Sequence, residues 1–109
     1  GLQAVAAAGN DQASAAAISA FEGSVVLVSG ADSTKGVRLP ALADVPVGHL
    51  FMIVNNTAGQ TLEVYPASGD KIAPGGDNAG IEVAASSMII CIAADDAQWV
   101  GAEPAVISV

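Results

Sequence analysis

Hydrophobic residues recur along this chain in short runs separated by turn residues, a pattern that predicts β-strands. The clearest alternation is at 61–65, where Leu62 and Val64 are expected to point inward. Two runs, 50–54 and 88–93, are apolar on both faces, which is typical of a strand covered on both sides. Further strands are expected at 24–29, 36–39, 81–83, 98–100 and 105–109, and a short one begins at Ile72.

The spacing of the turns predicts the fold class. Turn signals recur about every 8–12 residues, so the chain is predicted to be all-β, an antiparallel β-sandwich or small β-barrel. The runs 50–54 and 61–65 are expected to pair as a hairpin. A length of 109 residues suits one domain. We expect a single β domain over 22–109, preceded by an N-terminal arm over 1–21 that contacts another subunit or a partner protein.

The Ala-rich segment 11–21 fits two interpretations. Ala is the best helix former, and Asn10 or Asp11 is suited to cap a helix. Its only bulky apolar residues are Ile18 and Phe21, so a helix would be anchored for one turn at most. We therefore expect an extended Ala-rich arm that packs closely against another chain or sheet, with a short helix as the alternative.

Charge restricts the partners that this chain can bind. There are 11 acidic residues against Lys35, Arg38 and Lys71, for a formal net charge of −8. Nucleic-acid binding requires clustered Lys and Arg, so nucleic acids and anionic lipid surfaces are not expected as partners. The chain also lacks the run of about 18 apolar residues that a membrane-spanning helix requires, so no membrane partner is predicted.

Candidate catalytic and metal-binding residues are few. His49 and Cys91 are the single His and Cys of the chain, so they cannot complete a tetrahedral zinc site. Neither lies in a recognisable nucleophile signature, and Cys91 is expected to be a buried small hydrophobe. The adjacent Asp95 and Asp96 are best explained by a turn. We predict no enzyme activity, no catalytic residue, no cofactor and no metal.

Two binding sites deserve consideration as alternatives. Asp70, Asp77 and Asn78 lie in a Gly-rich loop, which is where calcium ligands occur, but their spacing matches no known calcium motif and turn chemistry is favoured. Trp99 and Tyr65 together suggest a sugar-stacking platform. A lone Trp near the end of an apolar strand is more often a core or interface anchor.

Three motifs give the chain a family resemblance. They are Val37-Arg38-Leu39-Pro40, Val64-Tyr65-Pro66-Ala67-Ser68-Gly69-Asp70-Lys71-Ile72, and Gln98-Trp99. The layout over residues 11–100 resembles small structural proteins and domains of tailed bacteriophages, found as head decoration (cement) proteins or as head-fibre and tail-fibre modules. These motifs are scaffold features, so the resemblance implies a fold and a class of role but no active site.

The resemblance implies a non-enzymatic virion protein, a capsid decoration protein that binds the outer capsid surface and stabilises the head. The N-terminal arm over 1–21 is then expected to make the subunit or capsid contact. The expected partners are the major capsid protein and further copies of this chain, in a homotrimer, because small and apolar residues permit close subunit contact. The alternatives are a tail-fibre, head-fibre or baseplate module, or a carbohydrate-binding module. The interface candidates are Leu2, Val5, Ile18, Phe21, Trp99, Val106 and Ile107.

Overall fold

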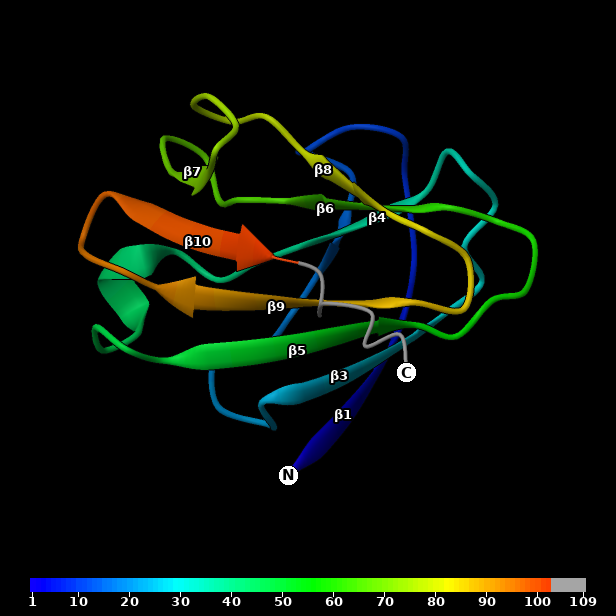
Figure 1. Cartoon of the computed structure of the whole chain (residues 1–109), viewed down its shortest axis with the longest axis horizontal. Coiled ribbons are helices and arrows are strands. Elements are labelled where there is room, and N and C mark those ends of the chain that lie inside the picture. Colours follow the sequence, from blue (N-terminus) through cyan, green and yellow to red (C-terminus); the bar gives the residue numbers. More distant parts are fainter. Residues whose placement is uncertain (103–109) are drawn as a thin grey trace, which may run out of the picture.

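The computed structural model describes residues 1–102, which form two mixed β-sheets arranged as a β-solenoid (Figure 1). In spatial order, the six-stranded sheet contains β1 (Leu2–Ala6), β3 (Val25–Ser29), β5 (Leu50–Asn55), β9 (Met88–Ala93), β10 (Gln98–Ala102) and β7 (Lys71–Ala73). The four-stranded sheet contains β2 (Ala16–Ala17), β4 (Gly36–Arg38), β6 (Leu62–Tyr65) and β8 (Ile81–Val83). One 3-10 turn, η1 (Leu42–Asp44), lies between β4 and β5.

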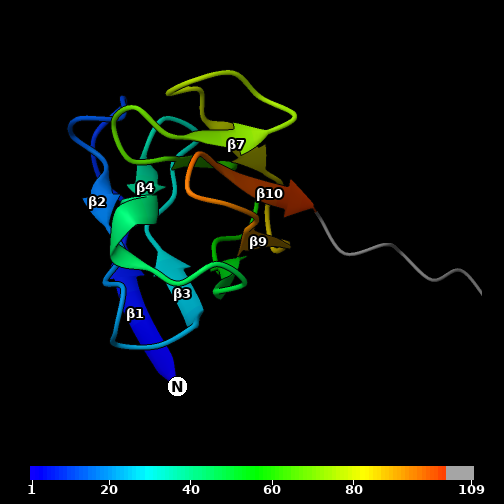
Figure 2. The same ribbon diagram turned by 90° about the vertical axis from the view of Figure 1, so that its left-hand side faces the viewer.

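The chain enters the two sheets alternately from β1 to β8. Strands β1, β3 and β5 run parallel in one sheet, and β2, β4 and β6 run parallel in the other, so the first half winds as a coil. The direction then reverses, because β8 pairs antiparallel with β6 and β9 pairs antiparallel with β5. The side view in Figure 2 shows β2 and β4 on the left of the molecule and β9 and β10 on the right.

The all-β prediction is confirmed, but the antiparallel β-sandwich or small β-barrel is wrong. Strands β1, β3 and β5 pair in parallel, as do β2, β4 and β6. A parallel pair requires a crossover connection, and here each crossover contains a strand of the opposite sheet. The hairpin expected between 50–54 and 61–65 is also wrong, because β5 and β6 lie in different sheets. A strand's hydrophobic pattern reports which of its faces is buried and does not identify the neighbouring strand.

The extended N-terminal arm, which was predicted together with that fold class, is also wrong. Residues 1–21 contribute one strand to each sheet. Strand β1 pairs with β3 along its whole length, and β2 pairs with β4. Asp11 caps a turn and not a helix, since its carboxylate accepts hydrogen bonds from the backbone N–H and the hydroxyl of Ser14 at 2.9 and 2.6 Å. The segment that follows is extended and packs against a sheet, which is the sheet of its own chain.

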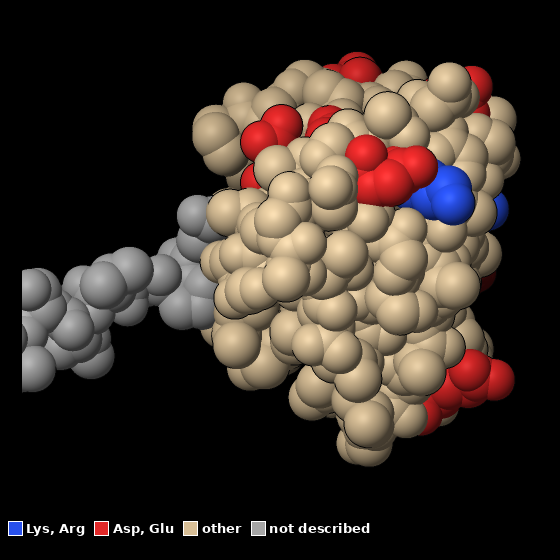
Figure 3. All heavy atoms as spheres, turned by 90° about the vertical axis from the view of Figure 1, so that its right-hand side faces the viewer, with Lys and Arg blue, Asp and Glu red and all other residues tan. Residues whose placement is uncertain are grey.

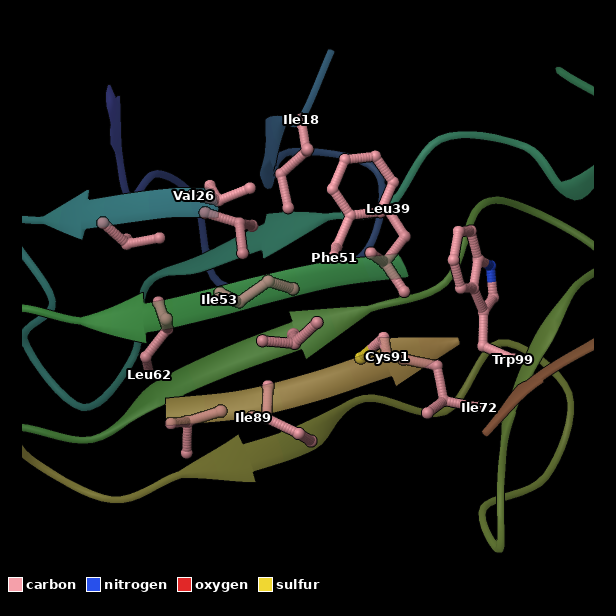
Figure 4. Close-up of a cluster of buried hydrophobic side chains, with 14 of the residues drawn as sticks. Ile18, Val26, Leu39, Phe51, Ile53, Leu62, Ile72, Ile89, Cys91 and Trp99 are labelled. Carbon is pink, nitrogen blue, oxygen red and sulfur yellow. The ribbon is translucent and has the colours of Figure 1, made fainter. Parts of the chain in front are cut away.

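The core lies between the two sheets and is formed by the inward side chains of both (Figure 4). Trp99 is the largest fully buried side chain; its ring lies 5.8 Å from that of Phe51, and its backbone pairs with Ile72. Two residues further along β10, Gly101 occupies a position where a Cβ would come within 2.8 Å of Ile72 Cγ2 on β7 and 3.0 Å of Ile81 Cδ1 on β8. A larger residue at this position would therefore displace side chains packed on both sheets.

Two buried amide side chains hold connections between the sheets. The Nδ2 of Asn55, at the end of β5, donates to the carbonyl oxygens of Gln60, Ala84 and Val83 at 2.8, 3.2 and 3.4 Å. These carbonyls belong to the β5–β6 connection and to the end of β8. The Nε2 of Gln3 in β1 donates to Ser19 O and Gly23 O, and its Oε1 accepts from Ser19 N. Each amide thus hydrogen-bonds backbone groups at or beside the connections between strands.

Replacing Trp99 with Ala is expected to lower the free energy of unfolding by about 3–5 kcal/mol, because a fully buried ring leaves a cavity. Urea denaturation followed by far-UV circular dichroism measures the change. Phe21→Ala is the matched control, since Phe21 is 85% exposed, and its midpoint is expected to equal that of the wild type. Equal midpoints for both variants would contradict the burial of Trp99.

Replacing Asn55 with Ala is expected to cost about 1–3 kcal/mol, because three buried or partly buried carbonyl oxygens lose their donor. The neighbouring Asn56→Ala is the control. The Asn56 side chain is exposed, so the free energy of unfolding is expected to change by less than about 0.5 kcal/mol. If the two variants have the same stability, the β5–β6 connection and the end of β8 do not depend on the Asn55 amide.

Candidate functional site

The described residues contain no detected pocket and no group of three or more His, Cys, Asp or Glu side chains placed to hold a metal ion. No helix within 1–102 has the length and apolar character needed to cross a membrane. The features of this part of the chain that suit recognition lie on its outer surface. They are the outer faces of the two sheets and one exposed corner.

The outer face of the six-stranded sheet is apolar on five of its six strands, and Lys71 belongs to the remaining edge strand, β7. Its outward side chains on β1, β3, β5, β9 and β10, which we call the apolar face, include no Asp, Glu, Lys or Arg among the described residues. Apart from Ser29 and Gln98, every one of them is hydrophobic. They are Leu2, Ala4, Ala6, Val25, Leu27, Leu50, Met52, Val54, Met88, Ile90, Ile92 and Val100.

The apolar face is continuous across the strands. Leu50 of β5 pairs with Ile92 of β9, which pairs with Val100 of β10, and the three side chains are 39–42% exposed. A second row follows Leu2, Val25, Met52 and Ile90 across β1, β3, β5 and β9. Contiguous apolar surface of this kind marks interaction sites in soluble proteins.

The four-stranded sheet has a polar outer face. Glu63 of β6 and Glu82 of β8 are directly opposite each other in the register. Burial and then the neighbouring Glu82 charge raise the pKa of Glu63 above its ordinary value. Arg38 on β4 is engaged locally, because its Nη1 donates to the carbonyl oxygens of Gln12 and Ala13 at 2.9 and 3.2 Å. In the end view of Figure 3, acidic side chains gather on the upper part and at one lower corner, with a broad uncharged area between them.

One corner of the first coil exposes large hydrophobic side chains. Phe21 is 85% exposed in the β2–β3 connection, and Leu2 is 62% exposed at the start of β1. The two segments touch, since Val25 N donates to Gly1 O at 3.2 Å and Gly1 lies against Glu22 and Gly23. Phe21 and Leu2 form the exposed corner of the molecule, and an exposed aromatic ring is a typical anchor of a protein interface.

The predicted interface residues therefore occupy different environments. Leu2 and Phe21 are exposed, Val5 is half-buried, and Ile18 and Trp99 are buried in the chain's own core. Val106 and Ile107 lie outside the described residues. The sequence analysis did not identify the apolar face as a candidate site, although the two-sided apolar runs 50–54 and 88–93 were a signal for it.

The residues considered for chemistry have structural partners. Asp95 Oδ1 accepts hydrogen bonds from Ala97 N and Gln98 N, as a turn residue does. Asp70 Oδ2 accepts from Leu42 N at 2.9 Å, and Asn78 Oδ1 accepts from Gly69 N at 2.7 Å. These oxygens therefore hold loops together through backbone donors.

The remaining reactive or aromatic candidates are embedded in the fold. Cys91 is buried as expected, and burial raises the pKa of its thiol to about 12. The His49 ring packs edge-on against Phe51 at 4.9 Å. The sugar-stacking platform is not formed, because Trp99 is fully buried and the Tyr65 hydroxyl donates to Asn10 O at 3.4 Å.

No protein-family model matches the chain, and no curated protein or solved structure is significantly similar to it.

Replacing Glu82 with Gln is expected to raise the free energy of unfolding at pH 7 by about 0.2–1 kcal/mol, because it removes a like charge directly opposite Glu63. Since the folded-state pKa of Glu63 is raised, its protonation stabilises the fold. That contribution is complete below the unfolded pKa and is lost as the pH rises through the folded pKa.

The gain from Glu82→Gln should therefore shrink when urea midpoints are measured below about pH 4, where Glu63 is protonated. Glu22→Gln, a change at an exposed loop residue, is the control and is expected to leave the stability at pH 7 unchanged. A Glu82→Gln variant that is less stable than the wild type at pH 7 would contradict the repulsion.

Proposed function

We propose that this chain is a non-enzymatic structural protein of a tailed-bacteriophage particle, a decoration protein that binds the outer capsid surface and stabilises the head. In this role it acts through protein–protein contacts as a homo-oligomer, expected to be a trimer, and its other partner is the major capsid protein. The observation that carries the proposal is the combination of an exposed aromatic corner and an uncharged sheet face on a small β-solenoid.

The motifs behind the phage resemblance support a scaffold role. Val37 and Leu39 are buried in the core, and Arg38 between them binds the 12–15 turn. Asp70, at the end of the turn that follows β6, fixes the start of η1 through Leu42 N. Trp99 anchors β10 over the core. Residues that pack the core and fix the loops make the molecule rigid, so its contacts with partner proteins are made by other, surface side chains.

The exposed corner is the proposed capsid contact. Phe21 keeps 85% of its surface exposed and Leu2 keeps 62%, an arrangement that is unfavourable in water for such large apolar side chains. Neither side chain belongs to the buried core, so binding at this corner requires no opening of the fold. Aromatic residues of this kind contribute most of the binding energy at many interfaces.

Cosedimentation with expanded, DNA-free capsids of the encoding phage tests the proposal. The wild type is expected to pellet with the capsids, and Phe21→Ala is expected to weaken binding on the order of 30-fold or more. Val47→Ala is the matched control, because Val47 is also an exposed apolar loop residue, at 68%, in a different connection. Its binding should equal that of the wild type.

Two results would overturn the proposal. One is a wild type that stays in the supernatant with capsids, and the other is a wild type that binds purified tails in preference to heads. If the wild type binds and Phe21→Ala binds equally well, the decoration role stands and the corner is not its contact.

A further inference from the structure

We propose that the apolar face of the six-stranded sheet binds a further copy of this chain, so that the sheets of neighbouring subunits pack face to face. This inference deepens the proposed function, on which it rests for the expectation of a homo-oligomer. It assigns the subunit contact to outward residues such as Leu50, Ile92 and Val100, which differ from the interface candidates identified by sequence analysis.

Strands β5 and β9 are apolar on both faces, and the described residues supply no layer that covers their outer face. The two strands are adjacent in the sheet. Runs of this type occur in sheets that are buried on both sides. On the inner side, Phe51, Ile53 and Ile89 are buried against the opposite sheet. On the outer side, the exposed row Leu50–Ile92–Val100 has no such layer in the described residues.

The absence of charge favours a second copy as the occupant. A symmetric contact brings the same patch of two subunits together, so the patch must be complementary to itself. With 11 acidic and three basic residues in the chain, a patch that carried charge would be predominantly negative and would repel its copy. The apolar face carries no charged side chain, and highly apolar interfaces are typical of homo-oligomers.

The size of the face suits a small subunit contact. Strands about 4.8 Å apart and about 17 Å long give five neighbouring strands a plan area of about 400 Å². Two such faces have a combined plan area of about 800 Å², which side-chain relief increases, so the contact belongs among the smaller protein–protein interfaces. Sheets packed in this way lie about 10 Å apart with interdigitated side chains.

The native mass of the full chain, measured by sedimentation equilibrium without capsids, tests this inference. The wild type is expected to have a mass of two or more times 10.6 kDa. Ile92→Glu introduces an unpaired charge at the centre of the exposed row, and it is expected to weaken self-association on the order of 30-fold or more. Ala17→Glu is the matched control, because Ala17 is exposed on the four-stranded sheet, and it should associate like the wild type.

Folding of each variant is checked by the fluorescence of the buried Trp99 and by near-UV circular dichroism. Leu50→Lys, in the same row, provides a second charged variant in case Ile92→Glu does not fold. Loss of self-association in either folded variant, with retention in Ala17→Glu, supports the inference.

A monomeric wild type would overturn the inference, and the apolar face would then belong to a different occupant, such as capsid protein or residues 103–109 of this chain. A folded Ile92→Glu that self-associates like the wild type would overturn it equally. Because no capsid is present, failure here is distinct from failure of the decoration role. A chain that self-associates through this face but does not bind capsids would leave the inference standing and remove the proposed function.

Discussion

The satisfaction of backbone polar groups where the chain passes from one sheet to the other is the constraint on which this fold depends. Buried N–H and C=O groups must be paired, and carbonyls at these connections have no strand beside them. Asn55 and Gln3 solve this problem with buried side-chain amides that bond across the connections. They are the only buried polar side chains among residues 1–102.

Because the chain winds around a single core, every strand has one outer face. The two sheets differ in the polarity of the side chains on that face. Glu63, Glu82 and Arg38 belong to the four-stranded sheet, where water solvates the charges. The six-stranded sheet instead presents rows such as Leu50–Ile92–Val100. Burial of that surface against another subunit would release it from water, which is the largest favourable term in most protein association. The molecule therefore has one solvated side and one side suited to assembly.

The exposed corner and the apolar face, which meet at Leu2, carry the two proposed contacts. Phe21 and Leu2 project from the first coil, where a single aromatic anchor is suited to a partner of different structure. The centre of the apolar face, around Ile90 and Ile92, is broad and uncharged, which is suited to an identical partner. A subunit with both surfaces is able to associate with its copies while it binds a larger surface.

From β3 onward, the sequence by itself determined the positions of the strands and the sides that they bury in the core, whereas β1 and β2 were not predicted. The alternation at Leu62 and Val64 and the burial of Cys91 were predictable because side-chain direction in a strand follows a period of two. Only the tertiary structure decided which strands are neighbours, including the separation of β5 from β6 and the pairing of β1 with β3. Pairing depends on contacts between distant residues, and an alternating pattern has the same form whether a strand's partner is parallel, antiparallel or another chain.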